Sequence, residues 1–588
     1  MTSLIDNPAP SVDPKLAESL ALEVYGLHVI ASPLEGERDA NFRLEDKEGR
    51  KFVLKVANQG ESFDSLELQD QVLTRLRVNA PELKTPTVIV SLDEENIATV
   101  EIEGTTHLMR LVSWVEGKVA ADVPKTFGLL ADLGGYLAKL DLALEGLVPS
   151  GSHPPLLWDL QNATTLRKDL DFIADPEKRL RVERVLDQFD GSLKPQLDKL
   201  PKAVIHNDAN DWNVLVDSGN HNKVAGLIDF GDLVYSCRIC ELAVALPYFL
   251  FDQDDVLTAA RTMVAAYNTT YPLTDVELSL LWGLIQVRLA TTIVVGEKRA
   301  SLESDNAYHL ISLKPAWELL IRMQAMNAEV SYFAFRAACG LTPSPNADVI
   351  EKWFKGDEAS HLRSELFDYE LATVSKVPLD FRAGGLDLGD DEAQKSTKNF
   401  TKHLFARIAS KEAQAGIGFY GEDRVVYRGD QFTEHAAKGE RRSIHTGIDV
   451  FDQAGVPVYA PFDGEVVSAV NNEDWLDYGP TIILRHKIPG LDHEFFTLYG
   501  HLALESLEGL EPGVTVSSGD RIAWLGNYPV NGDWPPHLHF QIMTSLLGLT
   551  GNFPGVAPKS QWDVWSSICI NPNLIMKIPE DFFFREES

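Results

Sequence analysis

The sequence predicts a multidomain chain in which an α+β unit with two lobes precedes a mostly antiparallel β domain. Its 588 residues exceed the size of one ordinary domain. Up to about residue 115, short alternating apolar runs such as residues 52–56 follow a helical start, whereas residues 126–336 show mainly helical periodicity. After about residue 415, glycine and proline separate short runs of valine, isoleucine and tyrosine, which is typical of antiparallel sheets.

These changes of pattern give the expected domain limits. We expect a small lobe at residues 1–115, a helical large lobe at 116–345, a linker region at 346–415 and the β domain at 416–588. The linker region is placed around two turn-rich segments, residues 341–348 and 384–391, because glycine, proline and aspartate cluster there.

The chain is strongly acidic. It carries 53 lysine and arginine residues against 87 aspartate and glutamate residues, which gives a formal net charge of −34 at pH 7. An anionic surface repels phosphate backbones and anionic lipid heads, so neither a nucleic acid nor a membrane is expected as a partner. The charge mildly favours neutral or cationic small substrates.

The cysteines and the start of the chain predict a cytoplasmic protein. Four cysteines in 588 residues do not form a disulfide framework, and the first residues lack a basic segment followed by an apolar run. Cys237 and Cys240 have Cys-x-x-Cys spacing but no second pair, which favours a buried structural role. The most apolar stretch, residues 278–295, is interrupted by Arg288, so we expect a core helix that falls short of a membrane span.

Two segments of the large lobe carry groups that phosphoryl transfer needs. Residues 206–213 read His-Asn-Asp-Ala-Asn-Asp-Trp-Asn, and residues 228–232 read Ile-Asp-Phe-Gly-Asp. Transfer of a γ-phosphoryl group needs a base near the acceptor hydroxyl and oxygen ligands for magnesium. Asp208 fits the base, and Asn213 and Asp229 fit the Mg²⁺ ligands because hard cations take carboxylate and carbonyl oxygens.

The cation expected on the ATP phosphates comes from the small lobe. Lys55 lies on a predicted strand and points toward the α- and β-phosphates, and Glu67, in the following helix, is the carboxylate expected to orient it.

Two further parts of a nucleotide site are predicted from their position. Gly36 and Asn41 belong to a segment, residues 34–42, that predicts a turn over the nucleotide phosphates. Ser113 and Val115 lie where the lobes join, and their backbone groups are expected to face adenine.

These residues resemble the aminoglycoside phosphotransferase/choline kinase-like family, within the protein-kinase-like fold, over residues 20 to about 340. The Gly-Glu-x-Asp-x-Asn-Phe and His-x-Asp-x-Asn-Asp-x-Asn forms are most similar to its homoserine kinase and hydroxylysine kinase branch. The resemblance implies ATP- and Mg²⁺-dependent phosphorylation of a hydroxyl on a small amine or amino acid. It leaves two roles open for Asp211 and for Asp232, namely contact with a substrate ammonium or a structural cap.

A second constellation lies in the β domain. His445 and Asp449 are four residues apart, and His537 and His539 alternate on a predicted strand, so the latter two face one side. Catalytic zinc takes three protein ligands and keeps one position open. His445, Asp449 and His539 fit the ligands, which leaves His501 and His537 as free imidazoles that move a proton or stabilise an oxyanion.

These histidines and their surroundings resemble the lysostaphin-type zinc endopeptidases from about residue 419 to residue 573. The likeness includes Tyr-Gly-His-Leu at residues 499–502 and His-Leu-His-Phe at residues 537–540. It implies Zn²⁺ binding by His445, Asp449 and His539, with catalytic assistance from His501 and His537.

The combination resembles the front two modules of multidomain proteins that continue into a pyridoxal-phosphate enzyme of the class III aminotransferase (phospho-lyase) type. Only a short tail follows residue 573, so such a phospho-lyase is expected as a C-terminal or separate partner. The leading hypothesis is a bifunctional enzyme that phosphorylates an amino acid or amino alcohol and hydrolyses a peptide or amide. The alternatives are a kinase whose zinc domain is a non-catalytic binding or assembly module, and an aminoglycoside-type antibiotic kinase. A homo-oligomer is one option for the assembly.

Overall fold

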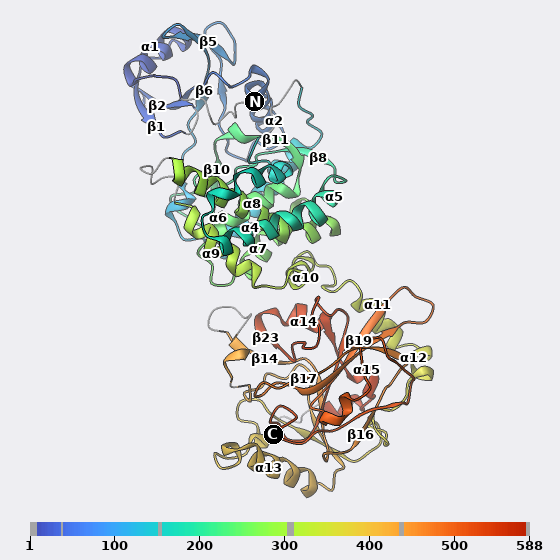
Figure 1. Ribbon diagram of the computed structural model, residues 1–588. Helices are drawn as coiled ribbons and strands as arrows, with labels where there is room; N and C mark the ends of the chain where they lie inside the picture. Colours follow the sequence, from blue (N-terminus) through green and yellow to red (C-terminus); the bar gives the residue numbers. More distant parts are fainter. Residues whose placement is uncertain are drawn as a thin grey trace. The chain divides into compact units, whose positions relative to one another are not determined.

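The structure, a computed structural model, describes residues 9–36, 39–150, 156–302, 311–427, 429–433 and 440–583. Contacts divide the chain into two units, unit 1 at residues 1–328 and unit 2 at residues 329–588. In Figure 1 the colours run from blue to yellow-green through unit 1 and on to red through unit 2.

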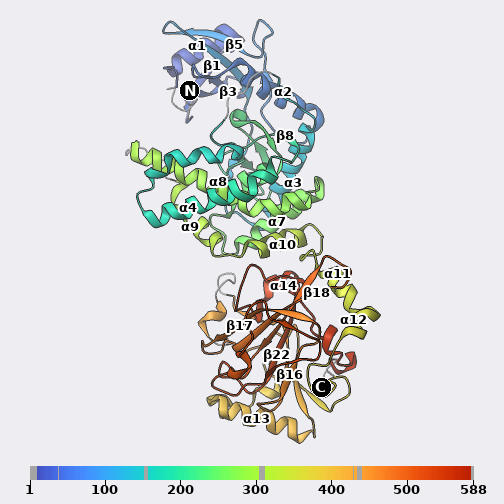
Figure 2. The same ribbon diagram turned by 45° about the vertical axis from the view of Figure 1, so that its right-hand side comes forward.

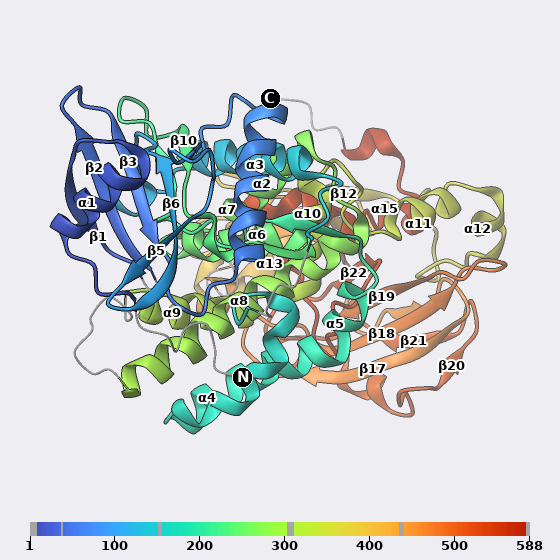
Figure 3. The same cartoon turned by 90° about the horizontal axis from the view of Figure 1, so that it is seen from above.

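The small lobe of unit 1 is an antiparallel sheet with strand order β1-β2-β3-β6-β4, and β5 also pairs with β6. Its inner face buries Leu44, Leu54 and Leu111 completely, together with residues of helix α1. Seen from above, α1 lies against this sheet (Figure 3). The elements are α1 (Pro14–Tyr25), β1 (Val29–Leu34), β2 (Ala40–Asp46), β3 (Lys51–Val56), α2 (Phe63–Asn79), β4 (Val88–Ile89), β5 (Ala98–Ile102) and β6 (Thr105–Ser113).

The large lobe is mainly helical, with two small sheets that carry the loops of interest (Figure 2). The sheets have the strand orders β10-β9-β7 and β11-β8. The strands are β7 (Lys118–Val119), β8 (Lys202–Ile205), β9 (Val214–Val216), β10 (Val224–Leu227) and β11 (Val234–Cys237). The α-helices are α3 (Phe127–Leu144), α4 (Pro176–Gln188), α5 (Lys194–Leu197), α6 (Ile239–Leu250), α7 (Val256–Thr270), α8 (Asp275–Leu302) and α9 (Leu313–Gln324).

Helix α8 contains the apolar stretch noted in the sequence. By length and composition alone, α8 is a candidate membrane span, contrary to our expectation. However, 94% of the apolar 18-residue segment that meets this criterion is buried inside the structure. This burial supports the interpretation of α8 as a core helix. Cys237 and Cys240 are also buried, and burial raises the pKa of the Cys237 thiol to about 11.

Unit 2 is built on a nine-stranded sheet of order β12-β13-β15-β22-β19-β18-β17-β20, with β24 pairing to β22. All of its pairs are antiparallel except β12 with β13. The strands are β12 (Lys376–Leu379), β13 (Ala415–Gly418), β15 (Ile448–Phe451), β17 (Gly464–Asn472), β18 (Gly479–Lys487), β19 (Glu494–Gly500), β20 (Thr515–Val516), β22 (Leu538–Met543) and β24 (Cys569–Ile570). Two further pairs join β14 (Arg442–His445) to β23 (Val556–Pro558) and β16 (Pro457–Tyr459) to β21 (Arg521–Trp524).

Residues 346–415, expected as a linker region, form an integral part of unit 2, so this expectation needs correction. They contribute β12 to the main sheet, and Ile350 and Phe354 on α11 are buried in the same core as strand residues such as Ile448. The physical reason is that α11 is amphipathic. A spacing of three and four residues places its apolar side chains on one face, and this face must be buried. The remaining helices of this unit are α10 (Ala328–Ala338), α11 (Ala347–Phe354), α12 (Asp357–Leu362), α13 (Thr397–Ser410), α14 (Trp562–Ile568) and α15 (Asn573–Met576).

The predicted fold class is confirmed. A two-lobed α+β unit precedes a unit built mostly of antiparallel strands.

Candidate active sites

One buried carboxylate holds the start of the loop between β8 and β9. The Glu241 side chain, on α6, accepts the backbone N–H of His206 at 2.6 Å and that of Asn207 at 3.2 Å. Asn207 has a positive φ of 64°, so the chain turns sharply just before Asp208. Burial lowers the pKa of His206 to about 4, so this imidazole is neutral and accepts the Asp208 N–H.

Asp208 and Asn213 lie together at the surface of this loop. The Asn213 amide donates to the Asp208 carboxylate at 2.7 Å and to the Asp208 carbonyl at 2.9 Å. The five-residue spacing seen in the sequence therefore brings the predicted base and a predicted magnesium ligand into direct contact.

Asp208 has an unusual electrostatic environment. The Arg288 Nη2 group donates to its carboxylate at 3.2 Å and to the Tyr248 hydroxyl oxygen at 3.0 Å. Burial and the nearby Asp232 carboxylate raise the pKa of Asp208 to about 8, against the opposing charge of Arg288. A carboxylate with a raised pKa is well suited to accept a proton from an acceptor hydroxyl.

Lys55 and Asp229 come from different lobes and form an ion pair of 2.9 Å. Lys55 is contributed by β3, and Asp229 follows β10 with a positive φ of 59°. The Asp229 side chain is 52% exposed, which leaves carboxylate surface available to a metal ion.

Lys55 is paired with Asp229 and not with Glu67 among the described residues, so the orienting role of Glu67 stays a prediction. Arg110 is the cross-strand neighbour of Lys55 on β6, and its guanidinium pairs with Asp70 of α2 at 2.8 Å. Glu67 lies instead along an open cavity of about 840 Å³ that Gln71 also lines. The helical character of this segment was predicted, but the face of the helix that meets the sheet was not.

The predicted turn over the phosphates is described in part. A side chain at Gly36 would collide with the Asn41 amide and with the Asp39 carbonyl, so these residues fold closely together. The Asn41 side-chain oxygen is buried and has no hydrogen-bond partner among the described residues. Residues 37 and 38, between them, lie outside the described residues.

The two residues predicted to contact adenine differ in whether their hydrogen-bonding groups are already used. Ser113 is occupied, because its N–H donates to the Thr87 carbonyl and its Oγ accepts the Thr87 N–H. The backbone groups of Val115 take no hydrogen bond within the described part of the chain. Val115 therefore fits a backbone contact to adenine better than Ser113 does.

Asp211 has a structural partner. Its carboxylate pairs with Lys125 at 3.0 Å, which favours the structural role over contact with a substrate ammonium.

In unit 2, three predicted zinc ligands converge from neighbouring strands. Asp449 on β15 is in register with His539 on β22, and His445 ends β14. The potential ligand atoms of the three side chains lie within 4.8 Å of one another. Both His445 Nε2 and His539 Nδ1 approach the same Asp449 oxygen, at 3.2 and 2.9 Å.

The hydrogen bonds of the two histidine nitrogens that face away from Asp449 show whether the three side chains fit zinc. His445 Nδ1 contacts the Phe419 carbonyl at 2.9 Å, and His539 Nε2 contacts the Gln541 side-chain oxygen at 2.7 Å. Each oxygen requires an N–H on the nitrogen that it faces, so the lone pairs are directed toward Asp449. Two neutral imidazoles and one carboxylate form a donor set that Zn²⁺ takes, so the residues fit the metal.

The two imidazoles predicted to assist catalysis are beside this cluster. The rings of His501 and His537 have centroids 4.2 Å apart, and each uses Nδ1 on a backbone carbonyl. Burial is the main cause that lowers the pKa of His537 to about 4 and that of His501 well below its usual value. Both imidazoles are therefore neutral, and each has the unprotonated Nε2 left over from its Nδ1 hydrogen bond.

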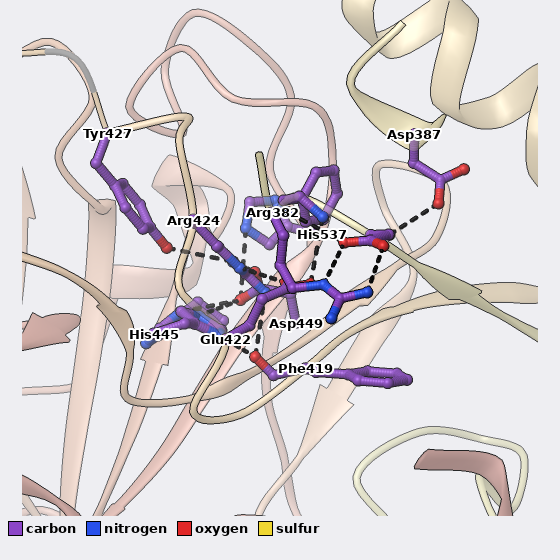
Figure 4. Close-up of polar contacts among 12 residues, drawn as sticks. Arg382, Asp387, Phe419, Glu422, Arg424, Tyr427, His445, Asp449 and His537 are labelled. Carbon is purple, nitrogen blue, oxygen red and sulfur yellow. Dashed lines mark hydrogen bonds and ion pairs between the residues drawn. The ribbon is translucent and has the colours of Figure 1, made fainter. Parts of the chain in front are cut away.

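Arg424, which the sequence did not point to, holds the carboxylate of the predicted zinc ligand Asp449. Arg424 donates to the Asp449 oxygen Oδ2 at 2.6 Å and to Glu422 at 2.9 Å (Figure 4). It is 4% exposed and also contacts the Tyr427 hydroxyl. A Glu-x-Arg pair in a turn-rich segment usually lies on the surface, so the pattern gave no signal of this role. In unit 1, the position of Arg288 inside an apolar run of the sequence already indicated a buried charge.

Comparisons with protein families agree with both sites. Residues 30–275 match the phosphotransferase enzyme family, and residues 443–549 match peptidase family M23.

Known relatives match the first unit. Hydroxylysine kinase of Xenopus laevis is 28% identical over 348 residues, which cover 55% of this chain and 93% of that protein. Hydroxylysine kinase of Mus musculus is 27% identical, covering 53% and 89%. Homoserine kinase of Phenylobacterium zucineum is 38% identical over 84 residues, covering 14% and 25%.

Solved structures are also similar over this region. The amicoumacin kinase hAmiN has a TM-score of 0.42 at 14% identity and covers 53% of this chain and 93% of its own. A microcompartment-associated aminopropanol kinase has a TM-score of 0.40 at 18% identity, with coverage of 56% and 99%. From the sequence matches and the geometry together, the chain joins a domain of the phosphotransferase enzyme family to a domain of peptidase family M23.

Proposed function

We propose that unit 1 transfers the γ-phosphoryl group of ATP to a hydroxyl of a small amino-hydroxy compound. The observation that carries this proposal is that the Asp208–Asn213 pair and the Lys55–Asp229 pair lie close enough for the Asp229 charge to act on the pKa of Asp208. The hydroxylysine kinases support an acceptor that carries both an amine and a hydroxyl.

The roles of the four side chains follow from their chemistry. Asp208 accepts the proton of the acceptor hydroxyl as the oxygen attacks phosphorus, and Lys55 binds phosphate oxygens of ATP. Asn213 and Asp229 would hold Mg²⁺, which neutralises phosphate charge when it is bound. The pair of Lys55 with Asp229 keeps the lysine beside the predicted metal ligand before ATP binds.

The test is an ATP-consumption screen over hydroxy amino acids and amino alcohols with the full chain. Asp208→Asn should lower the turnover of the best acceptor by at least about 100-fold, because it removes the base. Asp171→Asn is a matched control, since the Asp171 side chain is 94% exposed. Equal turnover by the wild type and Asp208→Asn would contradict the proposal.

For unit 2 we propose zinc-dependent hydrolysis of a peptide or amide. The supporting observation is the placement of the His501 and His537 rings beside the His445, Asp449 and His539 cluster. When bound, Zn²⁺ would polarise a carbonyl and activate water. In that arrangement, the Nε2 atoms of His501 and His537 move the proton or contact the developing oxyanion.

A second candidate for unit 2 is a binding or assembly module that holds zinc without turnover. It is favoured by burial, because the five side chains are between 0% and 5% exposed, so a peptide must displace covering residues to reach them. Peptide mixtures incubated with fully zinc-loaded protein and with His445→Ala distinguish the two. Cleavage by the loaded protein alone supports the hydrolase, and uncut mixtures support the module.

The setting that we propose is cytoplasmic, with a pyridoxal-phosphate phospho-lyase as a partner that eliminates the new phosphate. The four free cysteines support a reducing compartment. Fractionation of cells that express the chain tests the location, and its recovery outside the cytoplasm would contradict it.

A further inference from the structure

Phe381 is a buried aromatic residue that is connected to the zinc site of unit 2 by two routes. It follows β12 by two residues, is 2% exposed and lies outside the segment that matches peptidase family M23. Its ring centroid is 5.1 Å from the Arg424 guanidinium carbon and 5.7 Å from the centroid of the Phe451 ring. Each of these two neighbours contacts a different side chain of the predicted site.

The first route leads through Arg424 to the predicted zinc ligand Asp449. The Arg424 guanidinium lies within cation–π range of the Phe381 ring and donates to Asp449 Oδ2 at 2.6 Å. The Phe381 N–H also donates to Glu422 Oε1 at 3.3 Å, and Glu422 Oε2 accepts from Arg424 at 2.9 Å. The ring and the backbone of Phe381 therefore contact both members of the Glu422–Arg424 pair.

The second route leads through Phe451 to the imidazole of His537. Asp449 and Phe451 are two residues apart on β15, so their side chains lie on the same face of this strand. The rings of Phe451 and His537 are stacked, with centroids 4.5 Å apart and an interplanar angle of 15°. Because Phe451 is 4% exposed and close-packed, its contact with Phe381 limits how far the stacked pair can shift.

Core packing explains only part of the placement of Phe381. The side chain belongs to a small apolar core that includes Val377 and Leu379, and an aliphatic side chain of similar volume would fill that core nearly as well. An aromatic ring adds two interactions that an aliphatic side chain cannot make, attraction of the Arg424 charge and a directional contact with the Phe451 ring. Both of these interactions lead toward the zinc site.

We propose that Phe381 is a positioning residue of the zinc site, which holds the Asp449 carboxylate through Arg424 and the His537 ring through Phe451. This inference rests on the proposed zinc site of unit 2 and extends that site to the chain segment that follows β12. Loss of the ring should lower zinc affinity by about 3- to 10-fold, which is less than the loss expected when Arg424 itself is removed.

The first test measures the zinc affinity of the full chain by competition with a chelator. Phe381→Met removes the ring but keeps most of the apolar volume, so we expect affinity to fall by about 3- to 10-fold, whereas Phe381→Tyr keeps the ring and should stay within about twofold of wild type. Phe381→Leu replaces Phe381→Met if the latter does not fold.

Phe354→Met is the matched control for lost packing in this test. Phe354 is 1% exposed and packs among other rings of unit 2, namely Trp353, Phe462 and Phe495. We expect this variant to unfold at a lower temperature and to keep the zinc affinity of the wild type. Equal affinities in wild type and Phe381→Met, or equal losses in Phe381→Met and Phe354→Met, would overturn the inference.

The second test is a double-mutant cycle with Arg424→Met. If Phe381 acts on the metal through Arg424, then Phe381→Met should lower zinc affinity by less than about twofold in the Arg424→Met background. Full additivity of the two losses would show that Phe381 is only a core residue. A wild-type protein that binds no zinc would instead contradict the proposed zinc site itself.

The route through His537 is tested with a peptide that the wild type cleaves, at saturating zinc. His537 is expected to act on the reacting atoms, so Phe381→Met should lower kcat by at least about threefold and leave KM within about twofold. An unchanged kcat would overturn the part of the proposal that concerns His537.

Discussion

At the residue scale, both sites depend on arginines that touch a functional carboxylate. Arg424 occupies Oδ2 of Asp449, so Oδ1, which both ligand histidines approach, is the oxygen left for a metal ion. Partners of this kind orient metal ligands and tune their affinity. Arg424 and Asp449 are both buried, and the charge of each favours the ionised form of the other. Their ion pair is therefore a fixed part of the site.

Removal of Arg424 should weaken metal binding. Arg424→Met leaves the Asp449 carboxylate free to rotate and the Glu422 charge without its partner, so we expect zinc affinity to fall by about 10- to 100-fold. Competition with a chromophoric chelator measures this without any activity assay. Arg382, which Figure 4 shows beside the site, gives the control variant Arg382→Met. Its side chain is 55% exposed and pairs with Asp380. Unchanged affinity in Arg424→Met would contradict the assigned role.

Several predicted site residues lie together in the structure because short spacings in the sequence already place them close. Asp208 and Asn213, or His537 and His539, are close in the chain and share one loop or strand. A helical pattern does not show which helix face meets a sheet, so the ion pair of Asp70 on α2 with Arg110 on β6 was not predicted. Arg288 and Arg424 meet their carboxylates across 80 and 25 residues, a distance that spacing alone does not reveal.

At the element scale, α8 begins with a reciprocal cap. Thr274 Oγ1 accepts the Glu277 N–H, while the Glu277 carboxylate accepts the Thr274 N–H and two contacts from Arg238. This arrangement satisfies N–H groups that a helix start leaves unpaired and ties α8 to the segment before α6.

The charge of Glu277 should make this cap sensitive to acid. Burial opposes ionisation, but the Arg238 and Thr274 contacts prevail and lower the pKa of Glu277. A pKa that is lower in the folded state adds stability above the unfolded value of about 4.5, and this stability is lost as pH falls through the folded value. We expect Glu277→Gln to lower the free energy of unfolding by about 1–3 kcal/mol at pH 7. Urea titrations at pH 7 and below pH 4.5 should show the difference shrinking, and a constant difference would contradict the assignment.

The elements at residues 346–415 were the main part of the fold that the sequence did not predict. Glycine and aspartate made the region look like a connector, whereas its short helices and β12 are stabilised only by burial against strands far along the chain. Tertiary contacts of this kind do not leave a local pattern.

A fragment that begins at residue 416 should therefore fail to fold. It lacks β12 and exposes the core surface that Ile350 and Phe354 cover, whereas a fragment of residues 329–588 keeps both. We expect the longer fragment to be soluble with a cooperative thermal transition and the shorter one to aggregate. Within the full chain, Phe354→Ala should cost about 3–5 kcal/mol, because the side chain is 1% exposed. A cooperative transition in the shorter fragment would show that these elements are dispensable.

At the scale of the whole molecule, domains of two enzyme families are joined in one acidic chain. Each unit has its own core and its own cluster of functional side chains, and the net charge of −34 is far larger than the bound cations would offset. The chemistry of one cluster uses no residue of the other.

The two sites should respond independently to mutation. Asp208→Ala should abolish ATP turnover and leave zinc content unchanged, while His445→Ala should remove zinc and leave ATP turnover within about twofold, since sites that share no partners are usually additive. Metal analysis and coupled ATP assays on both single variants and the double variant test this. A double variant that departs from the product of the single effects would reveal coupling between the units.

The burial of the zinc ligands also affects how an ion arrives. With His445 at 0%, Asp449 at 2% and His539 at 4% exposure, solvent does not reach the donor atoms in the closed structure. Exchange of a bound ion then waits for local opening, so its rate reports the frequency of that opening rather than the strength of the bonds. Loading of the site by an added ion should therefore be slow and limited by the same opening.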